Sequence, residues 1–330
     1  MSNLQEKTNL DPYRKYLEKK HGGFEASEEL IEKIVEKATG SRPIKRSRII
    51  EGEVNEVYDV TTEDKQDVIV RISRQGRANF ETEERVIRMA LMVGVPAPKV
   101  LLIEDASSGP EKLTFCVEEK IEGESLKKLM GSMDKSTLKS IISEAGRILS
   151  KINSITVERF GHLDGPVIYK TWGDYIFNLE NKRDRIIEIG ESFGIETSTI
   201  NGVFKLLREN EKVFQVKEPK LLHGDFSPKH LVIKSNHIVG VLDFEDAKGG
   251  DPVQDLARIN YFNYNVFPID WLKEGYGNKD LFDDNFDLKM KLYRLQMGLG
   301  FLDYYNSENN ESGINYTKDR LIADLKSFRS

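Results

Sequence analysis

The sequence predicts an α+β protein of two lobes, in which an antiparallel sheet with one inserted helix is followed by a mainly helical lobe. Residues 47–117 hold short runs of β-branched residues, interrupted by one segment of helical pattern over 81–93. After Gly123 the apolar residues recur at the 3.6-residue spacing of amphipathic helices. A chain of 330 residues is also long enough to build two such lobes.

Residues 1–42 are predicted to form a helical extension at the N-terminus. This segment is rich in Lys and Glu, and residues 27–37 place four apolar side chains at helical spacing. The sequence does not indicate which surface these side chains cover. The N-terminal, nucleotide-binding lobe is expected over 43–117. Its strands are predicted at 49–50, 57–60, 68–72, 100–103 and 114–117.

A hinge is predicted over 118–123, and the C-terminal lobe over 124–330. An apolar stripe between Leu138 and Ile152 has the 3.6-residue period of a core helix. Asp251 before Pro252 is typical of a helix start, because the carboxylate can cap free N–H groups and proline is tolerated in the first turn. Further elements are expected as helices over 172–189, 200–214 and 281–305 and as strands over 231–234 and 238–242, joined by a turn at Ser235 and Asn236.

The composition excludes several classes of partner. A formal charge of −6 gives no general attraction to nucleic acids or anionic membranes, and it slightly favours a cationic small molecule. No uninterrupted apolar run has the length of a membrane span, and the first 30 residues lack the apolar segment of a signal peptide. The single cysteine, Cys116, lies in an apolar run and is expected to be buried. We therefore expect a cytoplasmic protein.

Two nearby segments point to phosphoryl transfer: LHGDFSPKHL at 222–231 and GVLDFED at 240–246. A kinase centre needs an aspartate that orients the acceptor hydroxyl, a metal ligand five residues later, and a second aspartate after a short hairpin. Asp225, His230 and Asp243 have this spacing. Gly-Asp alone is also common in turns, so the prediction depends on the downstream spacing.

These motifs and five others make the chain resemble the aminoglycoside phosphotransferase family, a group of small-molecule kinases with a protein-kinase-like fold. In the order of its motifs it is especially similar to hygromycin-type phosphotransferases. The similarity covers roughly residues 45–305 and departs from the family pattern at two positions, where His230 replaces the usual asparagine and Arg71 a frequent lysine. The other motifs are EGEVNEVY at 51–58, VIVRI at 68–72, EERVI at 83–87 with VPAPKV at 95–100, VEEKIEG at 117–123, and DPVQDLA at 251–257, with a weaker match in FGHL at 160–163 and TWGDY at 171–175.

The resemblance implies Mg²⁺ and either ATP or GTP as the phosphoryl donor. It implies that Asp225 is the catalytic base or orienting group, that Asp243 and His230 hold the metal, and that His223 packs structurally. Mg²⁺ prefers oxygen over the nitrogen that neutral imidazole offers, so the alternative that His230 only hydrogen-bonds the loop stays open.

For the nucleotide, the resemblance implies that Arg71 contacts the phosphates. Its expected partner is Glu83, with Glu84 as the competing choice, although an ordinary exposed cross-sheet charge would also explain the arginine. Asn55 is expected to close over the phosphates. The segment that contains Glu119 and Ile121 is expected to present backbone groups to the purine.

The acceptor is predicted to be a hydroxyl-bearing small molecule, and the acidic chain favours a cationic one. Candidate ligands for its ammonium groups are Glu245 and Asp246, beside the metal ligand, and the acidic run formed by Asp280, Asp283, Asp284 and Asp287. A solvated acidic face is the favoured explanation of this run, because the chain is acidic throughout.

The predicted function is therefore Mg²⁺-dependent transfer of the γ-phosphoryl group of ATP or GTP to a hydroxyl group of a small molecule. Two alternatives remain: a metabolic kinase for a sugar, amino alcohol or nucleoside, and a nucleotide-binding pseudokinase. A protein kinase is disfavoured, because the sequence has no Ala-Pro-Glu motif and no long activation segment after Asp243.

Overall fold

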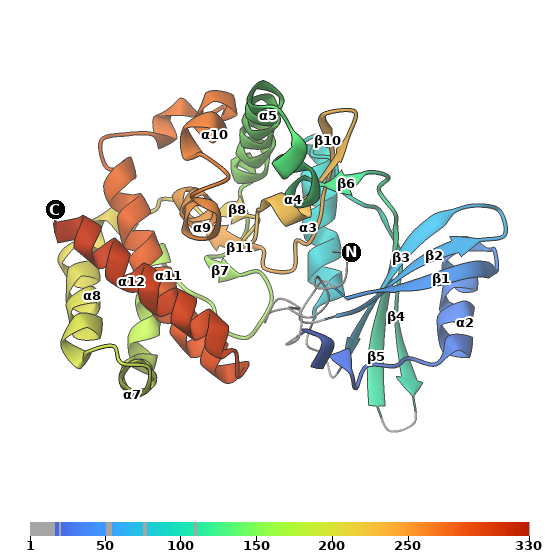
Figure 1. Cartoon of the computed structure of the whole chain (residues 1–330), viewed down its shortest axis with the longest axis horizontal. Coiled ribbons are helices and arrows are strands. Elements are labelled where there is room, and N and C mark those ends of the chain that lie inside the picture. Colours follow the sequence, from blue (N-terminus) through green and yellow to red (C-terminus); the bar gives the residue numbers. More distant parts are fainter. Residues whose placement is uncertain (1–16, 20, 51–54, 75–77, 109–110, 330) are drawn as a thin grey trace, which may run out of the picture. The chain divides into compact units, whose positions relative to one another are not determined.

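The computed structural model describes residues 17–19, 21–50, 55–74, 78–108 and 111–329 (Figure 1). The chain divides into two compact units, Met1–Glu84 with Pro98–Lys120 and Arg85–Ala97 with Ile121–Ser330. The chain passes into the second unit for the last time between Lys120 and Ile121, within the segment predicted as a hinge. Of the described helices, none is both long and apolar enough to span a membrane.

The first unit is built on a five-stranded antiparallel sheet, as the β-branched runs predict. Its strand order is β1-β2-β3-β5-β4, so the hairpin of β4 and β5 joins the sheet through β5. Helix α3 (Phe80–Met92) follows β3 in the chain. The strands are β1 (Pro43–Ile49), β2 (Glu56–Thr62), β3 (Asp67–Arg74), β4 (Val100–Ser108) and β5 (Glu111–Glu119).

Helix α2 (Glu28–Thr39) packs on this sheet, which is therefore the surface that the predicted N-terminal helix contacts. It begins at Ser27, whose hydroxyl accepts a hydrogen bond from the N–H of Leu30, and it ends at Gly40. Its buried face joins the apolar residues of β2, β3 and β5 in one core. The apolar residues at helical spacing over 27–37 are thus the ones that pack against the sheet.

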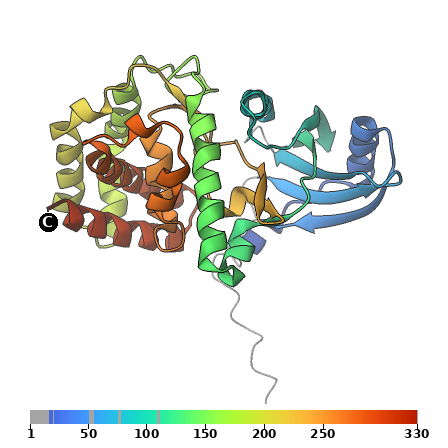
Figure 2. The ribbon, with the colours of Figure 1, turned by 90° about the horizontal axis from the view of Figure 1, so that it is seen from above.

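The second unit is mainly helical, as predicted, with two small three-stranded sheets in the orders β10-β9-β6 and β7-β11-β8. The long helix α5 runs beside α10 (Figure 2), and Gly146 permits this approach, because a Cβ atom there would lie 2.1 Å from the carbonyl oxygen of Leu272. The helices are α4 (Leu126–Leu129), α5 (Lys135–Ser154), α6 (Trp172–Phe177), α7 (Arg183–Ser192), α8 (Thr197–Glu209), α9 (Val253–Asn263), α10 (Ile269–Gly275), α11 (Phe286–Ser307) and α12 (Glu311–Arg329). The strands are β6 (Glu124–Ser125), β7 (Gly161–His162), β8 (Lys220–Leu222), β9 (Leu231–Lys234), β10 (His237–Val241) and β11 (Lys248–Gly250).

Three predicted helices differ from the observed ones. The helix expected over 200–214 begins at Thr197 and ends at Glu209, and a 3₁₀ helix follows over Glu211–Phe214. The helix expected over 172–189 is broken by a 3₁₀ turn, where the side chains of Asn178 and Asn181 bond each other at 2.9 Å instead of leaving the segment regular. The helix expected from 281 begins at Phe286, because Asp283 accepts the N–H of Asn285 in a local turn.

The predicted hairpin and helix start are confirmed. Ser235 and Asn236 have φ values of 51° and 62°, which suit a tight turn between β9 and β10. Asp251 accepts the N–H of Val253 at 3.1 Å and so caps the start of α9. These elements place the two segments of the kinase-like motif next to each other.

Candidate active site

Asp225 lies on the loop between β8 and β9, and this loop is fixed at Gly224. Gly224 has φ of 82°, and a Cβ atom there would lie 2.1 Å from the carbonyl oxygen of Asp246. Glycine is therefore required at this position, both for the left-handed backbone and for the close approach. The contact holds the Asp225 loop against the segment that follows the β9–β10 hairpin.

His223 is fully buried and serves as a structural residue. Its Nδ1 accepts the N–H of Asp225 at 3.2 Å, so the ring proton is on Nε2, which donates to the carbonyl oxygen of Leu242 at 3.2 Å. Burial, and then the nearby His230, lower the pKa of this imidazole, which favours the neutral ring that both contacts require.

Asp255 of α9 anchors the same loop through hydrogen bonds to its backbone. Its Oδ2 accepts the N–H of His223 at 2.9 Å, and its Oδ1 accepts the N–H of Gly224 at 2.9 Å. The side chain of Asn153 on α5 also donates to Oδ2 at 3.0 Å. Three donors on one buried carboxylate fix the two residues that precede Asp225.

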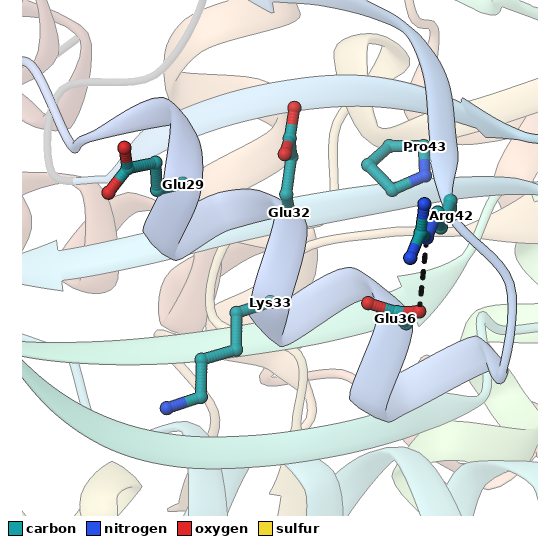
Figure 3. Close-up of a pocket in the computed structure, with 6 residues that line it drawn as sticks. All are labelled: Glu29, Glu32, Lys33, Glu36, Arg42 and Pro43. Atoms are coloured by element: carbon teal, nitrogen blue, oxygen red, sulfur yellow. Dashed lines mark ion pairs between the residues drawn. The ribbon is translucent and has the colours of Figure 1, made fainter.

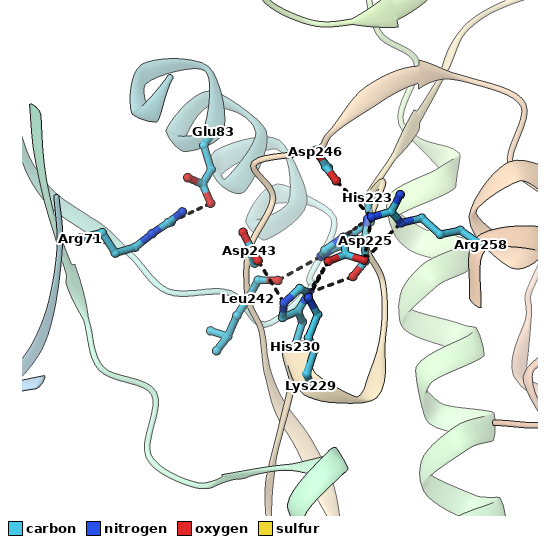
Figure 4. Close-up of polar contacts among 10 residues, drawn as sticks. All are labelled: Arg71, Glu83, His223, Asp225, Lys229, His230, Leu242, Asp243, Asp246 and Arg258. Atoms are coloured by element: carbon cyan, nitrogen blue, oxygen red, sulfur yellow. Dashed lines mark hydrogen bonds and ion pairs between the residues drawn. The ribbon is translucent and has the colours of Figure 1, made fainter. Parts of the chain in front are cut away.

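Asp225 itself is held by two cations. Its Oδ1 accepts from Nε and Nη2 of Arg258 at 3.2 and 3.1 Å, and its Oδ2 lies 3.0 Å from Nζ of Lys229 (Figure 4). Burial by itself would raise the pKa of Asp225, but the charges of Arg258 and Lys229 outweigh it and hold this pKa below its usual range. The carboxylate is thus ionised, 19% exposed, and available as a hydrogen-bond acceptor.

His230 and Asp243 lie together with Asp225 in a group that could hold a metal ion. Nδ1 of His230 lies 2.9 Å from the carbonyl oxygen of Asp225, which can only accept, so Nδ1 carries a proton. That Nε2 lies 3.0 Å from Oδ2 of Asp243. Two lone pairs so close repel each other unless a proton or a metal ion lies between them. One ligand atom from each of the three residues lies within 4.8 Å of the others, which suits a divalent cation.

The backbone of Asp243 supports a special role for this residue. Its φ of 66° is unusual for a residue other than glycine, and it lies two residues after the end of β10. Local strain of this kind is concentrated at ligand-binding positions. The turn directs the carboxylate toward His230 (Figure 4).

In the first unit, Arg71 is paired with Glu83, the partner that the sequence favours over Glu84. Nη1 of Arg71 lies 2.8 Å from Oε1 of Glu83 and 3.8 Å from Oε2 of Glu118. The guanidinium also lies over the ring of Phe80, with Cζ 5.1 Å from the ring centre. Because Arg71 is buried, the reading as an ordinary exposed charge is wrong.

The other expected nucleotide contacts are placed as follows. Asn55 is buried at the start of β2, whereas residues 51–54 of the predicted phosphate loop lie outside the described residues. Glu119 ends β5, and its N–H donates to the carbonyl oxygen of Lys99 at 2.9 Å. Ile121 is in the second unit, where its side chain packs against Gly240. Their contact with a nucleotide stays a prediction.

The acceptor residues that the sequence suggests are not brought together. Asp246 lies beside Asp225 but is paired with Arg258, whose Nη2 is 3.3 Å from its Oδ2. Glu245 is the half-buried neighbour of Asp246. Asp287 is fourteen residues from Phe301 on α11, hence about 20 Å along the helix axis from the ring that contacts Arg258. Asp280, Asp283 and Asp284 precede α11 and are exposed, as a solvated acidic face would be.

Two residues of the site, Arg258 and Asp255, were not predicted from the sequence. Asp255 lies within the motif at 251–257, and the spacing of one aspartate at each end of DPVQD was the available signal. Arg258 follows on the next turn of α9, but nothing in a single sequence shows that this turn faces Asp225.

Two surface hollows of the first unit lie away from these residues. One, of about 320 Å³, is lined by charged side chains of α2 with Arg42 and Pro43 (Figure 3). The other, of about 360 Å³, is lined by residues of the α3 start, β4 and β5. Neither contains a predicted catalytic, metal or nucleotide residue.

Comparison with known proteins places the chain among phosphotransferases. The sequence pattern of the phosphotransferase enzyme family matches residues 45–277, well over half of the chain. Hygromycin-B 4-O-kinase of Escherichia coli is 23% identical over 185 residues, which are 56% of this chain and 52% of that protein, so the chain matches about half the length of this curated relative.

Solved structures show the same kinase-like fold. A thermostable aminoglycoside phosphotransferase APH(4)-Ia variant in complex with ADP and hygromycin B superposes with a TM-score of 0.70 at 18% identity, over 90% of this chain and 98% of that one. A putative fructosamine-3-kinase from Thermobifida fusca has a TM-score of 0.66 at 16% identity, over 90% and 98%. Both likenesses concern the fold.

Proposed function

Because the chain belongs to the phosphotransferase enzyme family, we propose that it transfers the γ-phosphoryl group of ATP or GTP, with Mg²⁺, to a hydroxyl group of a small molecule. The observation that carries this proposal is the grouping of Asp225, His230 and Asp243 within 4.8 Å. Residues at that spacing in the sequence converge on one point of the second unit, on elements fixed by Gly224 and Asp255.

Asp225 orients the acceptor. The acceptor oxygen forms the new bond to the γ-phosphorus while the bond from that phosphorus to the bridging oxygen breaks, so nucleoside diphosphate leaves. The hydroxyl proton passes to the Asp225 carboxylate and then to solvent. A carboxylate with a lowered pKa is a weak base, which suits phosphoryl transfer because positioning matters more than early proton removal.

Asp243 and His230 are the proposed ligands of the metal ion, and Arg71, held by Glu83, is the proposed contact of the nucleotide phosphates. The bound metal would neutralise phosphate charge. Nδ1–H of His230 is engaged by the carbonyl oxygen of Asp225, and this contact keeps Nε2 directed at Asp243.

For the acceptor there are two candidates. The curated relative is named for hygromycin B, so an aminoglycoside is one candidate. A neutral sugar is the other, and the pairing of Asp246 with Arg258 favours it, because that carboxylate is already compensated. The metabolic-kinase alternative therefore remains a candidate.

A screen of acceptors with ATP and GTP, with and without Mg²⁺, tests the proposal. We expect metal-dependent release of nucleoside diphosphate that rises with one class of hydroxyl compound, together with a phosphorylated product in mass spectra. An Asp225→Asn variant controls for a contaminating kinase. Nucleotide binding without transfer to any acceptor would favour the pseudokinase alternative.

A further inference from the structure

Arg258 has hydrogen-bond donors beside Asp225 that bond to none of the described residues. Its Nε and Nη2 contact Asp225 and Asp246. Its Nη1 makes no hydrogen bond to any residue that the structure describes, and Figure 4 shows a guanidinium nitrogen without a contact among the residues drawn. A guanidinium carries five N–H donors, so Nη1 has two to offer a ligand.

The charges of Asp225 and Asp246 are paired within the protein. Asp225 and Asp246 are compensated by Arg258 and Lys229, at distances between 3.0 and 3.3 Å. Burial by itself would lower the pKa of Arg258, but the charges of Asp225 and Asp246 raise it above its usual range, so the guanidinium remains charged. An ammonium group beside Arg258 would therefore find a fixed cation and two carboxylates, Asp225 and Asp246, that are already paired.

Aromatic rings support the other side of Arg258. Its Cζ lies 5.6 Å from the ring centre of Phe262 on α9 and 5.3 Å from that of Phe301 on α11. Phe301 stacks on Tyr305 and Phe262 on Tyr316, at 5.8 and 6.0 Å between ring centres. These cation–π contacts hold the Arg258 guanidinium in place beside Asp225.

We propose that Arg258, held by these rings, forms an acceptor subsite for a neutral sugar-like polyol. Resting on the kinase function proposed above, the subsite places one hydroxyl on Asp225 while Nη1 of Arg258 donates to the oxygen on the neighbouring carbon. An ammonium on that carbon is rejected by charge repulsion. The acceptor is thus a vicinal diol, and Arg258 sets the specificity.

Matched acceptor pairs test the subsite: glucose against glucosamine and galactose against galactosamine, which differ by one oxygen and one ammonium. The quantity measured is the ratio of kcat/KM within each pair, corrected for hydrolysis without acceptor. The wild-type ratio should favour the neutral member by about tenfold or more. Arg258→Gln should lower the ratio, whereas Asp246→Asn, which leaves Arg258 in excess, should raise it.

Opposite shifts distinguish a specificity role from a structural one, because a loss of packing would change both members of a pair alike. Arg258→Lys should retain the charge discrimination with slower turnover, since the charge returns without the fork. Arg208→Gln is the matched control, because Arg208 also lies over a phenylalanine and pairs with a glutamate, away from both aspartates.

Three results would overturn the subsite: preference of the wild type for the amino sugars, shifts of the ratio in the same direction in both variants, or transfer to hygromycin B and to none of the sugars. Failure of all acceptors with retained nucleotide hydrolysis also counts against it. Absence of both hydrolysis and nucleotide binding in the wild type would instead refute the proposed kinase function.

Discussion

Each unit of the molecule places an arginine between two carboxylates and over an aromatic ring, yet the two arrangements differ in exposure. In the first unit, Arg71 is paired with Glu83 and Glu118, and the side chains of these glutamates are 4% and 9% exposed. In the second, Arg258 is paired with Asp225 and Asp246, which are 19% and 48% exposed. In the first unit, two buried glutamates fix the position of the Arg71 guanidinium. In the second unit, the Asp225 carboxylate and the N–H donors of Arg258 are within reach of a reactant.

The largest difference between the two arrangements should appear in turnover. Asp225→Asn should lower kcat by about 10²–10⁴, because the amide can neither accept the proton nor keep the negative charge, while nucleotide affinity stays close to that of the parent. Steady-state rates and nucleotide titrations measure the two effects. Asp246→Asn, which changes the other carboxylate on Arg258, should cost much less. Near-normal turnover of Asp225→Asn would remove this residue from the mechanism.

The arginine of the first unit should act on the nucleotide instead. Arg71→Ala should weaken nucleotide binding and slow transfer together, and Arg71→Lys should restore part of both. A double-mutant cycle of Arg71 with Glu83, read as binding free energy, should give a coupling of about 0.5–3 kcal/mol. Glu84 provides the matched control, because it neighbours Glu83 on α3. Coupling to Glu84 alone, or unchanged affinity in Arg71→Ala, would contradict the assignment.

Much of this comparison was accessible from the sequence. The family, the kinase-like fold and the antiparallel sheet followed from motif order and from β-branched runs, and they are confirmed. The pairing of Arg71 with Glu83 followed from a strand and a helix that are adjacent in the chain. The insertion of β5 between β3 and β4 did not, because strand order depends on long-range packing.

Arg258 was inaccessible for a similar reason. Its contacts join α9 to a loop 33 residues earlier, and no local pattern reports which turn of a helix meets a distant loop. The acidic run at 280–287 is a different case. Its charge pattern allowed a ligand site or a solvated face, and its exposed side chains fit the solvated face that the sequence favours, while contact with an acceptor stays untested.

Loss of the Asp255 carboxylate should destabilise the protein more than loss of a surface carboxylate. Asp255→Asn should lower the free energy of unfolding by about 1–3 kcal/mol, since the amide has one acceptor oxygen for three donors and its NH₂ group meets backbone N–H groups. Denaturant unfolding measures this loss. Asp174→Asn, at the exposed capping box of α6, is the control and should cost less. Equal losses in the two variants would mean that Asp255 does not anchor the loop.

The smallest expected effect is on the pH dependence of kcat/KM, which should respond to a change of Arg258 but not of Arg71. The pKa of Asp225 is lowered in the folded protein, so its ionised form contributes stability above the unfolded pKa of about 4, and that contribution is lost as pH falls through the folded pKa. Protonation of Asp225 should therefore produce no decline of kcat/KM between about pH 5 and 9. Arg258→Gln removes the main cation beside Asp225 and should move the acid limb of the profile to higher pH. Arg71→Lys should leave this limb in place, because Arg71 faces different carboxylates. An acid limb that moves equally in both variants would show that Arg258 does not control the ionisation of Asp225.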